Sequence, residues 1–178
     1  MKKYSENFMK IKPAIIVFLF LFSCGLFSGT VYAQNRFAFP YVFSTQDIYG
    51  RTVTQTSLGE KELFFVHYFA SWCPPCVKEM PDLASIAEKY GDRVGFIALL
   101  DDFNEGKEAI IRLAENAGIS FIIVSAGHRD FRVLSRMVQS GYVPTTILIG
   151  RDGKMIGERI VGAYGLGYAG FIDKALGR

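Results

Sequence analysis

Cysteine is scarce in this chain, which has three cysteines among 178 residues. Small secreted domains that depend on disulfides for stability carry more cysteines, spread along the sequence. Here Cys73 and Cys76 stand three residues apart, and a bridge between them closes too short a loop to restrict the unfolded chain much. The scarcity therefore excludes a stabilising disulfide framework and favours a chemical role for this pair.

Net charge is also small, and nothing in the predicted domain suggests a cluster of one sign. The formal net charge is only +3, and part of it lies in the first twelve residues. A nucleic-acid-binding surface would need Lys and Arg clustered in the folded part, so the pattern indicates an ordinary solvated surface. Half of the residues are hydrophobic, including 16 Phe and 9 Tyr, which is enough for one well-filled core.

Residues 1–33 have the three-part pattern of an export signal. Lysines outnumber the single Glu6 at the start, residues 14–22 are wholly apolar, and small residues follow as far as Ala33. Cleavage after Ala33 would make Gln34 the first residue of the mature protein. The sequence therefore predicts a signal peptide at residues 1–33 and a single domain at residues 34–178.

Two alternatives for the leader stay open. Its uncharged stretch is long enough to remain as a membrane anchor, and Cys24 lies in a loose match to a lipoprotein signal. All three interpretations place the domain in the periplasm or another extracytoplasmic space.

The segments after Gln34 predict an α/β fold. Phe39, Tyr41 and Phe43 alternate as in a half-buried strand, which residues 51–54 can pair with as an N-terminal β-hairpin. The further predicted strands are residues 63–69, 94–100, 121–124, 145–149 and 155–161. A helical segment follows Ser71–Cys76 and runs to about Tyr90, and the other predicted helices are residues 105–116, 131–138 and 168–176. This order favours a central mixed sheet with helices on both faces and an antiparallel edge.

The cysteine pair falls where the strand at residues 63–69 gives way to a helix. Backbone N–H groups at a helix start stabilise a thiolate, and the thiolate is the attacking species in disulfide exchange. The spacing of three places Cys76 next to Cys73, within reach of a bridge. Pro74 and Pro75 suit the first helical turn, and Trp72 would flank the site with an aromatic surface.

These residues belong to a longer pattern. Phe-Ala-Ser-Trp-Cys-Pro-Pro-Cys at residues 69–76 is followed by Glu79 and Pro81, and Tyr-Val-Pro-Thr-Thr stands at residues 142–146. A lone C-x-x-C is weak evidence, but this combination is specific. It resembles the thioredoxin-fold proteins, and more narrowly the TlpA/ResA-like extracytoplasmic thiol–disulfide oxidoreductases, which include cytochrome c maturation proteins. The resemblance covers nearly all of residues 34–178, including the N-terminal strand pair and the helix kink at Pro81.

The resemblance implies roles for residues beyond the cysteines. Pro144 would be cis, face the disulfide and keep metal ions from the two sulfurs, while Val143 would offer backbone hydrogen bonds to a substrate. Glu79 would be a catalytic residue beside Cys73 and Cys76, because its carboxyl group shifts the pKa values of the two thiols. The expected substrate-binding residues are Trp72, Pro74, Pro75, Val143 and Pro144. No metal and no cofactor besides the redox-active disulfide is expected.

His67 departs from the family pattern, which has an acid or an asparagine at this position. A histidine here could accept a proton from Cys76 near neutral pH. The interpretation that we favour is a hydrogen-bonded core residue, because buried polar groups generally find partners. His128 lies in a predicted loop and is expected at the surface.

The sequence thus favours an enzyme that reduces disulfides in exported proteins such as apocytochrome c. A membrane or periplasmic thiol donor would restore the dithiol. The same site could instead work as an oxidant. Two further alternatives are a copper-carrying thioredoxin-fold module, against which Pro144 and the cysteine spacing argue, and a peroxiredoxin-like peroxidase, whose proline–threonine arrangement is missing before Cys73.

Overall fold

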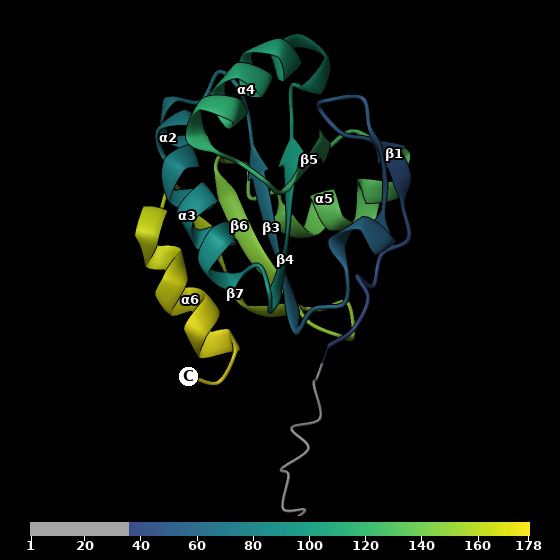
Figure 1. The fold of residues 1–178 in the computed structure, drawn as a ribbon, viewed down its shortest axis with the longest axis vertical. Coiled ribbons are helices and arrows are strands. Elements are labelled where there is room, and N and C mark those ends of the chain that lie inside the picture. The colour runs from purple at the N-terminus through teal and green to yellow at the C-terminus, as the bar shows by residue number, and fades with distance from the viewer. Residues whose placement is uncertain (1–35) are drawn as a thin grey trace, which may run out of the picture. The chain divides into compact units, whose positions relative to one another are not determined.

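The central element of the protein is a five-stranded mixed sheet with the strand order β5-β4-β3-β6-β7 (Figure 1). The computed structural model describes residues 36–178, so the leader predicted at residues 1–33 lies outside the described residues. Strands β3, β4 and β5 run parallel, and β6 and β7 continue the sheet antiparallel. The strand bounds are Leu63–Phe69 for β3, Val94–Leu100 for β4, Ile122–Ser125 for β5, Thr145–Ile149 for β6 and Met155–Val161 for β7.

Helices cover both faces of this sheet. Figure 1 shows α3 and α6 on one side and α5 on the other. The helix bounds are Pro74–Lys78 for α2, Met80–Tyr90 for α3, Phe103–Ala117 for α4, Arg132–Val138 for α5 and Tyr168–Ala175 for α6. Short 3₁₀ helices span Gln55–Leu58, Arg129–Phe131 and Gly165–Gly167.

Strand β3 shows why two layers of helices are needed. All seven of its residues are buried, and successive side chains of a strand point to opposite faces. Phe65 packs in a cluster with side chains of α3 and α6, whereas Phe64 and Val66 pack in a cluster with side chains of α5. A strand that is apolar on both faces therefore becomes the centre of the sheet.

The predicted N-terminal hairpin is present, but its first strand lies further along the chain. Strand β1 (Ser44–Gln46) pairs antiparallel with β2 (Thr52–Thr54) as a separate two-stranded sheet. The strand predicted through Phe39, Tyr41 and Phe43 is wrong. Their spacing reflects aromatic anchoring rather than strand pairing, because Phe39 and Phe43 are buried and their rings contact Phe64 and Phe131 respectively, each at 4.9 Å between centroids.

Most other element predictions are confirmed. Strands β3, β4, β6 and β7 have the predicted bounds, while β5 lies one residue later than expected and α4 begins two residues earlier. The turn between β6 and β7 contains Gly153 at φ 74°, a backbone conformation that favours glycine.

We predict that the aromatic anchor at residue 43 matters for stability although its backbone forms no strand. Phe43→Ala should lower the free energy of unfolding by about 3–5 kcal/mol, because a buried ring is lost and a cavity is left. The neighbouring change Val42→Ala is the control, since Val42 is 78% exposed, and it should cost no more than about 0.5 kcal/mol. Urea unfolding measures both, and equal losses would contradict the anchor.

Candidate active site

The two cysteines lie at the carboxyl end of β3, where the chain turns into α2. They form a disulfide with an S–S distance of 2.16 Å and a Cα–Cα distance of 5.3 Å. Cys73 is the N-cap of α2, and Pro74 and Pro75 fill its first two positions, as the sequence predicts. Both prolines are exposed, whereas Cys73 is 3% exposed and Cys76 is fully buried. An approaching molecule therefore meets Cys73 before Cys76.

A backbone amide of α2 points at the outer sulfur. The N–H of Cys76 donates a hydrogen bond to Cys73 Sγ over 3.3 Å. A hydrogen bond to the charged form of a group favours that form. The same amide would therefore stabilise a thiolate on Cys73 after reduction, which is the form that attacks disulfides.

The loop that leads into the site is fixed by a side chain from the next strand–helix connection. Asp102 accepts hydrogen bonds from the backbone N–H of Ser71, over 2.9 Å, and from the Ser71 hydroxyl. Gly106 of α4 passes so close that a Cβ atom there would lie 2.3 Å from Ser71 Oγ. Asp102 and Gly106 were not predicted from the sequence, because neither belongs to a motif and their partner Ser71 is more than thirty residues away.

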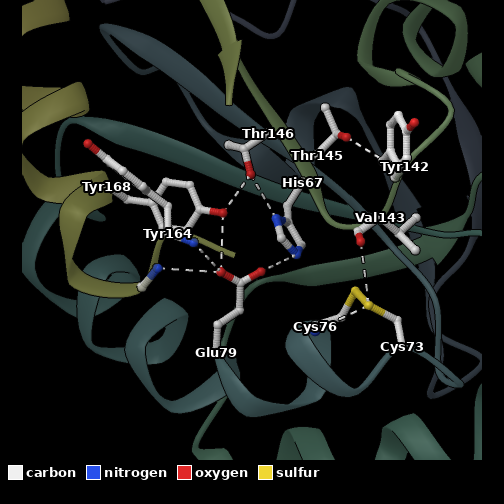
Figure 2. Close-up of polar contacts among 11 residues, drawn as sticks. His67, Cys73, Cys76, Glu79, Tyr142, Val143, Thr145, Thr146, Tyr164 and Tyr168 are labelled. Atoms are coloured by element: carbon white, nitrogen blue, oxygen red, sulfur yellow. Dashed lines mark hydrogen bonds and ion pairs between the residues drawn. A yellow bond between two sulfur atoms is a disulfide. The ribbon is translucent and has the colours of Figure 1, made fainter. Parts of the chain in front are cut away.

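The peptide bond between Val143 and Pro144 is cis, as the sequence resemblance implies. Pro144 is buried at the start of β6, and the Val143 carbonyl oxygen lies 3.7 Å from Cys73 Sγ (Figure 2). The topology brings these residues together because β6 is the antiparallel neighbour of β3. The loop before β6 therefore stands beside the disulfide.

Two hollows border the site, and exposed aromatic side chains border one of them. One hollow of about 290 Å³ is lined by Tyr68, Trp72, Asp101, Gln139, Gly141, Tyr142 and Val143. Trp72 and Tyr142 are 65% and 71% exposed. The other hollow, of about 540 Å³, is lined by Pro74, Pro75, Lys78, Glu79, Asp82, Ala163 and Gly165. The surface beside the cysteines thus offers apolar contact area and indentations for side chains.

Glu79 stands where the predicted single helix divides into α2 and α3. Pro81 lacks an N–H and cannot continue the hydrogen bonding of α2, so Glu79 ends one helix and precedes the next. Its side chain is only 3% exposed. Oε2 accepts hydrogen bonds from the backbone N–H groups of Tyr164 and Gly165, at 3.1 and 3.5 Å, and from the Tyr168 hydroxyl at 3.2 Å.

His67 is the buried neighbour of this carboxyl group. Its Nε2 lies 3.5 Å from Glu79 Oε1, and its Nδ1 lies 2.9 Å from Thr146 Oγ1 (Figure 2). The side chain is 2% exposed and stacks near Phe65 and Phe69. The expected core position with a hydrogen bond is confirmed, and the proton-relay role stays a prediction. His128 is partly exposed, at 29%.

Burial opposes the charge on both members of this pair. It raises the pKa of Glu79, an effect that hydrogen bonds from Tyr164, Gly165 and Tyr168 partly offset. Burial also lowers the pKa of His67 to about 3. At neutral pH His67 is therefore uncharged, and Glu79 holds a proton more tightly than an exposed glutamate does.

The partners of this pair, Tyr168 and Thr146, were not predicted from the sequence. Tyr168 and Glu79 are 89 residues apart, and no local pattern indicates that α6 brings a hydroxyl group to the site. Thr146 stands within the quoted motif at residues 142–146, but its contact with His67 depends on the register between β3 and β6.

Comparison with known proteins identifies the family. The model of the AhpC/TSA family matches residues 38–157, which include both cysteines, Glu79 and the cis-proline loop. The chain belongs to the AhpC/TSA family. Its fold is that of thioredoxin, as a solved structure illustrates: a thiol:disulfide interchange protein of the thioredoxin family from Chlorobium tepidum has a TM-score of 0.61 at 23% identity. That match covers 76% of this chain and 92% of the other.

Two relatives that match this chain in sequence carry names that describe thiol–disulfide chemistry. Thiol-disulfide oxidoreductase ResA of Bacillus anthracis is 30% identical over 122 residues, which cover 67% of this chain but only 66% of the relative. Sporulation thiol-disulfide oxidoreductase A of Bacillus subtilis is 25% identical over 136 residues, which cover 72% of this chain and 77% of the relative. The match thus spans slightly less than two thirds of the ResA protein.

The lowered pKa of His67 predicts a dependence of stability on pH. Below the unfolded-state pKa of about 6.5, the unfolded chain binds a proton at His67. The folded protein binds this proton only when the pH falls to about 3. The contribution of neutral His67 to the free energy of unfolding is therefore complete above pH 6.5 and is lost as the pH falls toward 3. Between pH 6 and 4, the parent protein should lose stability faster than His67→Asn, by up to about 1.4 kcal/mol per pH unit.

Urea unfolding at a series of pH values measures this difference. His128→Asn is the matched control, because it removes the other histidine, which is partly exposed, and it should leave the pH slope of the parent protein unchanged. A His67→Asn slope equal to that of the parent would contradict the buried, neutral state of His67.

Proposed function

We propose that the protein is an extracytoplasmic thiol–disulfide oxidoreductase that reduces disulfides in other exported proteins. The observation that carries the proposal is the Cys73–Cys76 disulfide, with its outer sulfur at a helix start and beside a cis-proline loop. The names of the ResA and sporulation relatives describe the same class of chemistry.

The proposed reaction uses the two sulfurs in sequence. In the dithiol form, the Cys73 thiolate attacks one sulfur of a client disulfide, and the other client sulfur leaves as a thiolate. The result is a mixed disulfide between Cys73 and the client. Cys76 then attacks Cys73 Sγ, which releases the second client sulfur and forms the Cys73–Cys76 bridge. The chemistry needs no cofactor besides this disulfide.

The surface around Cys73 suits an extended client segment. In this proposal the backbone of Val143 pairs with the client, and Pro144 holds that loop beside the disulfide. Trp72, Pro74 and Pro75 supply exposed contact area, and Glu79 tunes the cysteine pKa values. Backbone hydrogen bonds, as at Val143, give affinity with little demand for a particular client sequence.

The location and partners of the protein follow from the leader and the chemistry. The pattern of residues 1–33 supports export, and oxidised cysteines persist outside the cytoplasm. Among residues 36–178, no helix has the length and apolar character to cross a membrane. Apocytochrome c is the client that we favour, because its haem-attachment cysteines must be free thiols. A membrane or periplasmic thiol donor would reduce the Cys73–Cys76 bridge again.

The other functions considered from the sequence have less support. An oxidant would use the same two sulfurs, and its direction depends on the partner couple. For a copper carrier, the cysteines have two residues between them rather than three, and the Pro144 loop lies beside the two sulfurs. For a peroxidase, the segment before Cys73 is the end of β3 and the Ser71 loop, without the proline–threonine arrangement of peroxiredoxins.

Single-cysteine variants test the proposed reaction. Cys73→Ser should abolish reduction of an insulin disulfide, because the attacking sulfur is lost. Cys76→Ser should instead accumulate a mixed disulfide between Cys73 and the substrate, because the resolving sulfur is lost. Both variants are made with Cys24→Ser, so that no third cysteine contributes. Non-reducing electrophoresis and mass spectrometry detect the adduct, and an unmodified Cys76→Ser protein after exposure to substrate would refute the mechanism.

A further inference from the structure

Four buried side chains from four separate elements form a closed circle of polar contacts beside Cys76. They are Glu79, Tyr168, Thr146 and His67 (Figure 2), and we call them the ring. Three of its four contacts measure 2.9 to 3.2 Å, and the fourth, between Glu79 Oε1 and His67 Nε2, measures 3.5 Å. The ring comes from the α2–α3 junction, α6, β6 and β3.

The direction of the hydrogen bonds can be derived from Glu79 outward. Two backbone N–H groups, of Tyr164 and Gly165, point at Oε2. A backbone amide can only donate, so Oε2 is an acceptor and is a poor place for a proton. The Tyr168 hydroxyl therefore donates to Oε2, and its own oxygen accepts from the Thr146 hydroxyl.

The same counting fixes the tautomer of His67. The single hydroxyl proton of Thr146 is used toward Tyr168, so Thr146 Oγ1 must accept from His67 Nδ1. In a neutral imidazole, a proton on Nδ1 leaves a lone pair on Nε2. This lone pair faces Glu79 Oε1 in the protein interior.

These two facing atoms are otherwise unpaired. Among the described residues, His67 Nε2 and Glu79 Oε1 are both buried and lack any other hydrogen-bond partner. Two lone pairs facing each other without water would be unfavourable. One proton on Oε1, donated to Nε2, satisfies both atoms and leaves the pair without net charge.

We propose that the ring holds one proton between Glu79 Oε1 and His67 Nε2, and that this pair accepts the proton of Cys76 during disulfide exchange. Tyr168 and Thr146 are positioning residues, because they fix which nitrogen of His67 faces the acid. The functional half of this proposal rests on the thiol–disulfide activity proposed above, whereas the ring itself does not.

The neighbourhood of Cys76 supports this transfer. A cavity of about 10 Å³ is bordered by both His67 and Cys76 and otherwise by apolar side chains. Its volume is close to that of one water probe, so it is large enough for a single water that relays the proton but not for bulk solvent. The charged or titratable neighbours of the pair are Tyr168, Asp82, whose charge raises the pKa of Glu79, and Lys78, which lines the 540 Å³ surface hollow together with Glu79.

The step balances in atoms and charge. Before it, Cys76 is a thiol, Cys73 is joined to the client, and the pair is unprotonated with one negative charge. The Cys76 proton moves to the pair while its sulfur forms the bond to Cys73 Sγ. The Cys73–client bond breaks, and the client sulfur leaves as a thiolate. The product state is the Cys73–Cys76 disulfide with a protonated, neutral pair, and the disulfide is the one present in the structure.

Nitrogen NMR of the imidazole tests the ring directly. The full chain has two histidines, so His128→Gln leaves His67 as the sole signal. In the oxidised protein at pH 7, we expect a protonated Nδ1 and an unprotonated, hydrogen-bonded Nε2. A proton on Nε2, with or without one on Nδ1, would overturn the ring.

Matched variants test the positioning residues. In Tyr168→Phe, the Thr146 hydroxyl loses its acceptor and becomes free to donate to Nδ1, so His67 should shift toward the Nε2–H tautomer. Tyr164→Phe is the control, because only the backbone of Tyr164 contacts Glu79. Thr146→Ser keeps the hydroxyl and should keep the parent tautomer. An unchanged tautomer in Tyr168→Phe would contradict the assigned direction.

The rate of the resolving step tests the functional half. Glu79→Gln can keep the hydrogen bonds of the ring but accepts no proton, so release of a model client from the mixed disulfide should slow by about 100-fold or more at pH 7. Tyr168→Phe should displace the pH–rate profile, because it removes one hydrogen bond to the acid and changes which nitrogen of His67 carries the proton. Tyr164→Phe should leave the profile in place.

The outcomes separate the two proposals. If Cys76→Ser captures clients while Glu79→Gln releases them at the parent rate, the ring is not the proton acceptor and the oxidoreductase proposal stands. If Cys76→Ser captures no client, the oxidoreductase proposal fails, and the NMR result still decides whether the ring exists.

Discussion

The junction between β3 and α2 is the constraint on which the rest of the site depends. A strand buried on both faces ends, and a helix begins within a few residues, so Cys73 caps the helix and Cys76 falls inside the core. This arrangement makes the two sulfurs unequal although they are bonded to each other. The outer one receives a backbone hydrogen bond and lies near the surface, and the inner one is shielded from water.

The other parts of the site serve one or the other sulfur. The cis-proline loop and the exposed aromatic residues Trp72 and Tyr142 lie around the outer sulfur, where a client would arrive. The pair of Glu79 and His67 lies on the inner side, where no solvent is at hand to take a proton. A buried sulfur that must lose a proton needs a buried acceptor, and the interior next to Cys76 is otherwise apolar.

The sequence predicted what depends on local pattern. The apolar run at β3 and the cysteine spacing led to the fold and the position of the disulfide, and the cis bond before Pro144 was implied by the family resemblance that the quoted motifs carry. It did not predict what depends on tertiary register. Thr146 and Tyr168 reach Glu79 and His67 only because β6 pairs with β3 and α6 returns across the same face. The aromatic alternation near Phe39 was misleading for a similar reason, since burial of rings can produce the spacing of a strand without its pairing.

The equilibrium redox potential of the Cys73–Cys76 couple tests the central claim most directly. It can be measured on the purified protein by equilibration with glutathione or dithiothreitol buffers. A reductase of exported proteins predicts a value near that of thioredoxin, about −270 mV. A redox potential of about −120 mV, as in strongly oxidising members of the fold, would contradict the proposed direction of electron flow.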